Sequence, residues 1–216
     1  MKIRWNGHAS FSLFSDDGRC IVIDPYEQGS FGGAIGYHAI DSKPDVVLVT
    51  HDHQDHNYTD QFDGQFEILR DAGHAKGFDV AAFDAFHDKS QGNDRGAIKM
   101  FKVDVDGVKI CHVGDLGHVL SAEQIAGLGD VDVLMVPVGG VFTIDANEAT
   151  DLIERLRPKI AIPMHYKTER CGFEIAGVEE FTKGKSNVKT LDTDEIELFS
   201  DKLPGETEIL VLKHRL

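Results

Sequence analysis

Three histidines and two aspartates lie within six consecutive positions of the segment VTHDHQDHNYTD, residues 49–60. Alternate side chains of an extended chain point to the same side, so His51 and His53 can bind one ion together. Asp55 and His56 point elsewhere and can bind a second ion. Catalytic zinc takes nitrogen and carboxylate ligands and keeps one coordination position open for water. The segment therefore predicts a metal site with room for two ions.

A two-metal site needs more ligands than this segment supplies. Two ions roughly 3.5–4 Å apart can share a hydroxide and hold both the attacking and the leaving oxygen of a substrate. Further candidates follow apolar strands: His87 after DVAAFDAF, Asp115 after VKICHVG and His165 after KIAIPM. His74 is an alternative third ligand by sequence alone. His87 is favoured because AFHDKS ends an apolar strand, whereas AGHAKG reads as a turn.

The elements that must position these residues are strands followed by loops. PDVVLVT and VDVLMVPVGG are continuous apolar runs, as expected for strands buried on both faces. Helical stretches, SAEQIAGL and DANEATDLIERLR, lie between the later strands, and Asp145 and Glu148 have the spacing of a capping box. Functional residues of such sheets gather at the carboxyl ends of the strands. The candidate ligands are therefore expected to converge at one edge.

Shorter strands come in runs at both ends of the chain. They are KIRWNG, SFSLFS and CIVID near the start, and KTLD, EIELFS and TEILVLK near the end. This distribution favours two packed sheets with helices outside, in one α/β (α+β) domain spanning residues 1–216. The glycine-rich residues 27–43 are expected to be too flexible for a packed element. They form either a lid over the substrate or a surface loop.

Composition excludes several classes of protein. The chain has 216 residues, 41% of them hydrophobic, which suits one domain with a sizeable core. Its formal net charge of −15 makes nucleic acid an unfavourable partner. We expect no membrane span and no signal peptide, which predicts a cytoplasmic protein. Three distant cysteines do not form a disulfide framework; Cys171, six residues after His165, is either near a site or a loop thiol.

The segment THDHQDH has the form H-x-H-x-D-H and, with His87, Asp115 and His165, resembles the metallo-β-lactamase superfamily. The resemblance continues through NGHASFSL, IVIDPY, AFHDKSQGNDRGA, CHVGDLGHVL, VDVLMVPVGGVFTIDANEA and PKIAIPMHYKT. These stretches are similar to a subgroup of small bacterial and archaeal hydrolases. That subgroup also resembles L-ascorbate-6-phosphate lactonase and N-acyl-phosphatidylethanolamine phospholipase D. The motif differs from the H-x-E-x-D form expected of di-iron, flavin-linked relatives, which disfavours a redox function.

The resemblance implies a four-layer αββα sandwich with the site at one edge of the two sheets. It also implies two divalent transition-metal ions, with zinc as the first choice and nickel, iron or manganese as alternatives. The implied ligands are His51, His53 and His87 for the first ion, Asp55, His56 and His165 for the second, and Asp115 as a bridge.

Other residues near these motifs have two interpretations each. Asp24 is either a buried carboxylate that orients the metal-binding loop, which we favour, or a turn residue before Pro25. His8 and His118 join Asp55 and Asp115 as catalytic candidates: each shuttles protons or contacts substrate, or simply bonds to loop backbone.

Five further side chains have less specific expectations. Tyr166 either stabilises an oxyanion or packs in the core. Asp52 is expected to be solvated or to bond within its loop. His112 is expected to be structural, and His214 to be a tail residue. A substrate role for His38 has no support in the sequence.

The leading prediction is a metal-dependent hydrolase that uses a metal-bound hydroxide on a small polar or phosphorylated ester or lactone. Asp115 would set the metal separation and Asp55 would orient the hydroxide. Arg95, Lys167 and Arg170 are the cations available to a phosphorylated small-molecule substrate. One alternative is a phosphodiesterase of the same fold, and another is a non-catalytic metal-binding sensor or interaction module. The sequence carries no information on oligomeric state.

Overall fold

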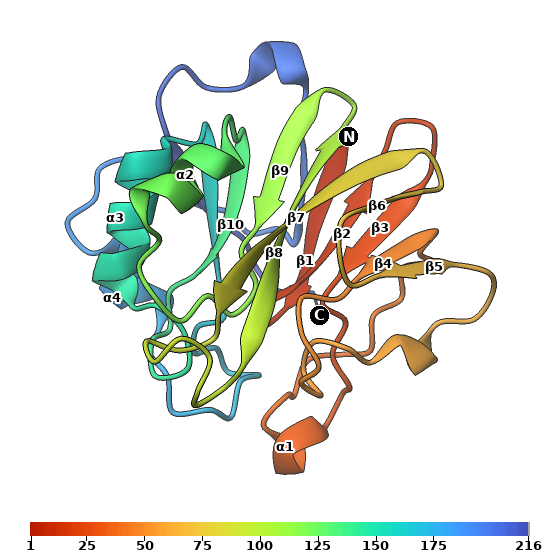
Figure 1. Cartoon of the computed structure of the whole chain (residues 1–216), viewed down its shortest axis with the longest axis horizontal. Coiled ribbons are helices and arrows are strands. Elements are labelled where there is room, and N and C mark those ends of the chain that lie inside the picture. Colours follow the sequence, from red (N-terminus) through yellow and green to blue (C-terminus); the bar gives the residue numbers. More distant parts are fainter. Residues whose placement is uncertain (216) are drawn as a thin grey trace.

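The computed structural model describes residues 1–215 and consists of two β-sheets packed face to face (Figure 1). In spatial order, the first sheet comprises β13 (Glu195–Glu197), β1 (Lys2–Gly7), β2 (Ser10–Phe14), β3 (Cys20–Ile23), β4 (Val46–Leu48) and β5 (Glu67–Leu69). The second comprises β12 (Val188–Thr190), β14 (Glu208–Val211), β11 (Ile160–Met164), β10 (Val133–Pro137), β9 (Val108–His112), β8 (Ala97–Val105), β7 (Phe78–Phe86) and β6 (Gly73–Ala75).

Three helices cover the outer face of the second sheet. They are α2 (Ala122–Leu128), α3 (Ala146–Leu156) and α4 (Val178–Thr182), grouped beside β10 in Figure 1. The expected capping box of α3 is confirmed: the Asp145 carboxylate accepts from the Glu148 amide, and the Glu148 carboxylate accepts from the Asp145 amide. Ser121 and Gln124 form an equivalent box at the start of α2. Each pair satisfies backbone donors that a helix leaves free.

The core lies between the sheets because β-strand side chains alternate. Leu13 and Ile21 face the second sheet, whereas Cys20 and Val22 face outward. Strands β10 and β11 pair in parallel, and all their residues are buried, as their continuous apolar sequence predicts. The expected α/β sandwich of two sheets is therefore confirmed.

The layer outside the first sheet is made of loop. Residues 25–43 contain one short, irregular helix, α1 (Ser30–Gly33), and cover Cys20 and Val22. The expectation that residues 27–43 are too flexible to pack is wrong for their second half. Ile35 and Tyr37 are fully buried, and the Tyr37 hydroxyl lies 2.8 Å from Thr168 Oγ1.

Three details differ from the sequence expectations. Strand β8 was not expected, and it pairs with β7 and β9 over most of its length. His74 lies on β6 instead of in a turn. His214 is buried, with Nε2 at 2.8 Å from Glu169 Oε1, so the residues near the end of the chain pack against the domain. No helix in residues 1–215 is long and apolar enough to cross a membrane.

Candidate metal centre

The candidate ligands converge at one edge of the two sheets, as the strand ends predict. The loop after β4 carries His51, His53, Asp55 and His56, and three loops of the second sheet meet it. These loops follow β7, β9 and β11 and carry His87, Asp115 and His165. All seven side chains except His53 are buried.

The first group consists of His51, His53 and His87, whose ligand atoms lie within 4.8 Å of one another. His51 Nε2 lies 3.0 Å from His53 Nδ1. His87 Nδ1 donates to the Phe142 carbonyl at 3.1 Å, which leaves the lone pair on Nε2. A bond that fixes one ring nitrogen determines which nitrogen can bind a metal. His87 therefore presents Nε2 to the group.

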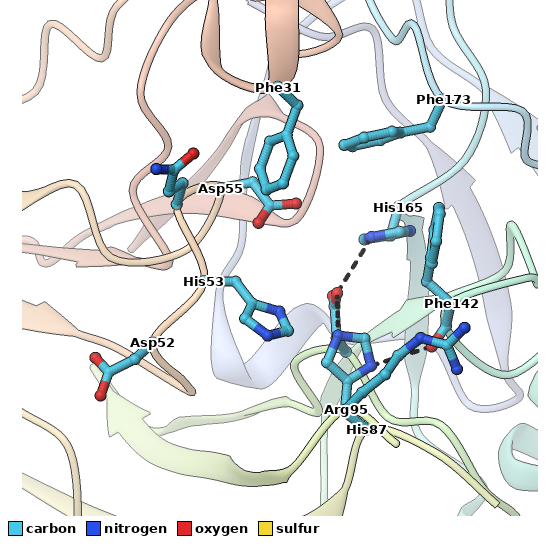
Figure 2. Close-up of a pocket in the computed structure, with 11 residues that line it drawn as sticks. Phe31, Asp52, His53, Asp55, His87, Arg95, Phe142, His165 and Phe173 are labelled. Carbon is cyan, nitrogen blue, oxygen red and sulfur yellow. Dashed lines mark hydrogen bonds and ion pairs between the residues drawn. The ribbon is translucent and has the colours of Figure 1, made fainter.

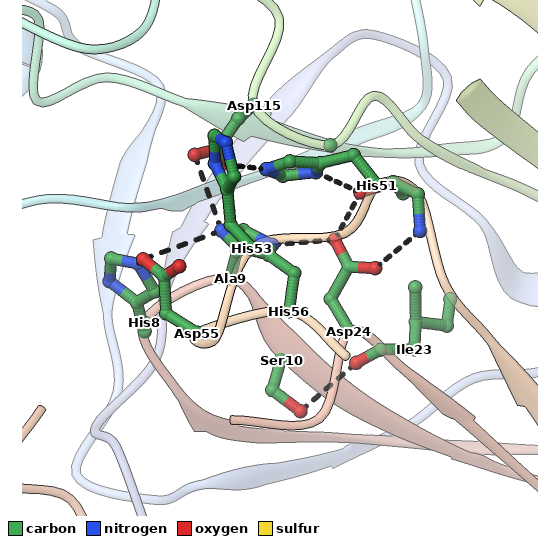
Figure 3. Close-up of polar contacts among 12 residues, drawn as sticks. His8, Ala9, Ser10, Ile23, Asp24, His51, His53, Asp55, His56 and Asp115 are labelled. Atoms are coloured by element: carbon green, nitrogen blue, oxygen red, sulfur yellow. Dashed lines mark hydrogen bonds and ion pairs between the residues drawn. The ribbon is translucent and has the colours of Figure 1, made fainter. Parts of the chain in front are cut away.

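The second group consists of Asp55, His56, His165 and His8, again within 4.8 Å. His8 Nε2 lies 3.0 Å from Asp55 Oδ2 (Figure 3). The His8 ring centre lies 4.1 Å from that of His165. The structure thus places His8 within the cluster. Its Nε2 holds one oxygen of Asp55 and leaves the other free.

One carboxylate oxygen joins the two groups. Asp115 Oδ2 lies 3.2 Å from His56 Nε2, 3.3 Å from His87 Nε2 and 3.2 Å from His165 Nε2. Asp115 therefore contacts His87 of the first group and His56 and His165 of the second. This is the position that a bridging ligand of two ions would occupy.

The donor set fits metal ions better than it fits a self-contained hydrogen-bond network. Among residues 1–215, His56 Nε2, Asp55 Oδ1 and Asp115 Oδ1 are buried and have no hydrogen-bond partner. Leaving such an atom unpaired costs about 1–3 kcal/mol, and more when the group is charged. Imidazole and carboxylate donors suit zinc, iron, nickel and manganese. Coordination would satisfy these three of the six unpaired buried side-chain atoms in residues 1–215; the other three are His8 Nδ1, His165 Nδ1 and Ser30 Oγ.

Asp24 organises the metal-binding loop from beneath (Figure 3). Its Oδ1 accepts the Thr50 amide at 2.8 Å, and its Oδ2 accepts the Thr50 hydroxyl at 2.7 Å. The same Oδ2 lies 2.9 Å from His56 Nδ1, and the Thr50 oxygen lies 2.9 Å from His51 Nδ1. Asp24 therefore directs the Nε2 atoms of both histidines toward the centre, as we favoured from the sequence.

Burial and neighbouring charges set opposite protonation states in the metal-free cluster. Burial lowers the pKa of His8 to about 4 and that of His51 to about 3. Burial alone would also lower the pKa of His56, but the carboxylates of Asp115 and Asp55 raise it well above its usual range. Metal binding requires neutral imidazole, and His8 and His51 already have it.

Lowering the pH from about 7 to about 5 is expected to destabilise the metal-free protein. The unfolded chain protonates His8 and His51 near the usual pKa of about 6.5, whereas the folded chain does not. The unfolded state then binds more protons, so the free energy of unfolding should fall by about 2 kcal/mol per histidine. The raised pKa of His56 contributes stability that is complete below about 6.5 and is lost only at higher pH. Urea unfolding of the metal-free protein across this pH range measures how the free energy of unfolding changes with pH.

The variant His8→Gln should remove the share of that pH dependence that His8 contributes, about 2 kcal/mol between pH 7 and pH 5. His51, His53 and His112, whose pKa values burial also lowers, keep the rest. An unfolding free energy that stays the same at both pH values would contradict buried, neutral histidines at these positions.

Several known proteins match this sequence and fold. A family model described as a β-lactamase superfamily domain matches residues 2–165. A metal-dependent hydrolase of Thermoplasma acidophilum is 32% identical over 193 residues, covering 78% of this chain and 84% of the relative. A Pyrococcus furiosus protein is 33% identical over 202 residues, covering 85% of this chain and 90% of the relative. This chain belongs to the metallo-β-lactamase superfamily.

A solved structure supports the same assignment. It is a Thermotoga maritima protein of the metallo-β-lactamase superfamily, suggested to be a zinc-dependent hydrolase. It is 33% identical, covers 99% of both chains and superposes with a TM-score of 0.81. Homology to relatives named metal-dependent hydrolases supports such an activity for this superfamily member.

Several catalytic and ligand candidates lie away from the metallo-β-lactamase site. His118 was a catalytic candidate, expected either to shuttle protons or contact substrate or to bond to loop backbone; the Phe86 amide donates to its Nε2 at 3.2 Å and its Nδ1 donates to the Val119 carbonyl at 2.9 Å. Both nitrogens are therefore occupied by backbone, which is the second of these two alternatives. His74 is exposed and paired with Asp79 at 2.7 Å, which removes it as a ligand.

Tyr166 is buried against Trp5, with ring centres 5.2 Å apart, and packs in the core. Burial raises its pKa, and it does not line the active-site pocket, so it is not placed to bind an oxyanion there. His112 is structural as expected: Nε2 donates to the Ala9 carbonyl at 2.8 Å. Lys167 Nζ donates to the Phe173 carbonyl at 2.7 Å and does not line the active-site pocket. Cys171 is a buried free thiol outside that pocket.

The active-site pocket opens beside the cluster and has a volume of about 490 Å³. Its lining is Phe31, Asp52, His53, Gln54, Asp55, His87, Arg95, Asp115, Phe142, His165 and Phe173. Figure 2 shows Phe31, Phe142 and Phe173 around the ligand side chains. These phenylalanines could not be predicted as pocket residues from the sequence, because aromatic residues scattered along a chain give no local signal of a shared wall.

Backbone conformation also marks the site. His8, Asp24 and His165 have positive φ angles of 52°, 47° and 51°. Non-glycine residues adopt this region at a cost and cluster at functional sites. Gly117 allows another close approach, because a Cβ atom there would lie 2.2 Å from the His87 backbone. The loop that carries Asp115 can therefore pack directly against His87.

Proposed function

We propose that this chain is a metal-dependent hydrolase that binds two divalent transition-metal ions and cleaves a carboxylic ester or lactone of a small molecule. The observation that carries the proposal is the position of Asp115 Oδ2 between the two ligand groups. His51, His53 and His87 would hold one ion, and Asp55, His56 and His165 the other. Zinc is the first choice, and the same ligands suit nickel, iron or manganese.

Two bound metal ions would lower the pKa of a water molecule to about 7 and would polarise the substrate carbonyl. The residues of the chain position these groups. His8 holds Oδ2 of Asp55, which leaves Oδ1 as the atom that would bind the second ion. The phenylalanines of the pocket exclude bulk water, which strengthens electrostatic interactions there.

The cations of the site favour a carboxylic ester over a phosphorylated substrate. Of Arg95, Lys167 and Arg170, only Arg95 lines the pocket. Lys167 bonds to Phe173 and pairs with Glu174. A phosphate group that carries two charges would thus find one positive side chain. A phosphodiester carries a single charge, and a phosphodiesterase remains the second candidate.

Hydrolysis assays on metal-loaded and chelated protein test the proposal. Wild-type protein loaded with zinc or manganese should hydrolyse nitrophenyl esters or lactones, and a chelator should abolish the turnover. Turnover of a bis-aryl phosphodiester alone would favour the phosphodiesterase. An absence of turnover on all three classes, with metal fully loaded, would favour a non-catalytic metal-binding module.

A further inference from the structure

A single guanidinium group faces the substrate side of the pocket without a carboxylate partner. Arg95 makes no ion pair with any of residues 1–215, and its Cζ lies 5.6 Å from the centre of the Phe142 ring. It lines both the active-site pocket and an adjoining cavity of about 420 Å³. The other cations of that cavity are neutralised: Arg70 pairs with Asp52, and Lys99 pairs with two aspartates. Arg95 is therefore the cation available to a ligand there.

The backbone that carries Arg95 is held by a buried carboxylate. Asp88 is 3% exposed, and its Oδ2 accepts the amide of Arg95 at 2.8 Å and that of Asp94 at 3.1 Å. Its Oδ1 accepts the amides of Ser90 and Gly92, both at 2.8 Å. Asp88 directly follows the ligand candidate His87. The position of Arg95 relative to the metal-binding residues is thus fixed by the fold.

An aromatic wall extends through the pocket from the Phe142 ring beside Arg95. The Phe173 ring packs edge-to-face on Phe31 at 5.4 Å and on Phe142 at 5.6 Å between ring centres. Figure 2 shows Arg95 at the Phe142 end of this wall and Phe31 at the other end. Phe31 is 48% exposed, so bound ligand can cover apolar surface that water now contacts. Each apolar group that it covers would add to binding.

We propose that the substrate is amphiphilic, with one anionic group that Arg95 binds and one apolar group that packs on Phe31, Phe142 and Phe173. This inference rests on the proposed hydrolase function and refines its substrate class. It replaces the expected small polar substrate, because three phenylalanines line the pocket. A single anionic group matches a single unpaired cation, and the net charge of −15 elsewhere disfavours a polyanion.

A pair of nitrophenyl esters tests the role of Arg95. The mono-p-nitrophenyl ester of glutaric acid carries a terminal carboxylate, and p-nitrophenyl valerate has a methyl group in its place. In zinc-loaded protein, Arg95→Gln should lower kcat/KM for the glutarate ester about 10- to 100-fold more than for the valerate ester. The loss should be in KM, because the charged group is remote from the reacting carbonyl. Arg95→Lys should restore part of the difference.

Two further variants separate charge from apolar contact. Lys89→Gln removes a positive charge from the same loop, but Lys89 pairs with Glu148 and does not line the pocket, so neither ester should be affected. Phe31→Ala should lower kcat/KM for both esters equally, by about tenfold, because both share the nitrophenyl group. Thermal melting of each variant checks that the fold is retained.

The outcomes distinguish this inference from the function on which it rests. If wild-type hydrolysis is chelator-sensitive but Arg95→Gln lowers kcat/KM equally for both esters, the inference about the substrate is overturned. The hydrolase function itself would then still stand. An absence of chelator-sensitive hydrolysis of either ester by wild-type protein would overturn the ester hydrolase itself, and the inference with it.

Discussion

Replacing Asp115 with asparagine is expected to lower kcat/KM of the metal-loaded protein by about 10³-fold and to reduce its metal content. Asp115 Oδ2 lies within 3.3 Å of three imidazole nitrogens from both ligand groups. Burial alone would raise the pKa of this carboxyl, but His165 and His56 hold it well below its usual range. The asparagine amide is neutral, so it cannot offset the positive charge of two bound cations. Losing one strong electrostatic contact in a buried site costs about 3–4 kcal/mol of transition-state stabilisation.

The control for this variant is Asp79→Asn, the same chemical change on an exposed residue of β7. Asp79 pairs only with the exposed His74, and such pairs contribute little. Metal content by plasma mass spectrometry and kinetics on one nitrophenyl ester should match the wild type for Asp79→Asn. Full metal content and full activity in Asp115→Asn would refute the bridging role.

The variant Asp24→Asn should destabilise the metal-free protein by about 3–5 kcal/mol, because it breaks a buried pair with His56. Burial alone would raise the pKa of Asp24, but His56 lowers it below its usual value, so the carboxylate is charged. An asparagine amide would also place a donor against His56 Nδ1 or Thr50. The metal affinity should fall about 10- to 100-fold, since Asp24 orients two proposed ligands.

Thr50→Val provides a milder version of the same test if Asp24→Asn does not fold. It removes the hydroxyl between Asp24 and His51 and keeps the carboxylate bond to His56. We expect a smaller loss of metal affinity, measured by competition with a chromophoric chelator. Unfolding curves and affinities equal to those of the wild type in both variants would show that Asp24 does not support the centre.

The ligand positions could be predicted because each follows a recognisable strand. Strands β4 and β11 are apolar throughout and β9 (VKICH) is largely buried, so their carboxyl ends were evident from the sequence alone. Strand β8 was missed because two lysines and one aspartate interrupt AIKMFKVDV, and its pairing with β7 and β9 makes it a strand. The two-sheet arrangement followed from the number of strands, and it did not depend on finding every one.

Contacts between distant loops could not be predicted. His8 reaches Asp55 because the turn between β1 and β2 gives it a φ of 52°, which a glycine-flanked sequence does not reveal. Lys167 follows His165 closely in sequence, yet its Nζ donates to the Phe173 carbonyl and its side chain does not line the pocket. Residues 27–43 pack because Ile35 and Tyr37 find partners in the first sheet and near Cys171. Some of these contacting residues are far apart in the sequence: Tyr37 and Thr168 are separated by 131 positions.

Metal content is the most direct test of the central claim, that two ligand groups share Asp115 in a two-metal centre. The protein should be purified without a histidine tag or a chelator, and its transition metals counted per chain by plasma mass spectrometry. We predict about two ions per chain, and about one in a His53→Ala variant that lacks a ligand of one group only. One ion or none in the wild type, after saturation with zinc, would contradict the two-metal centre.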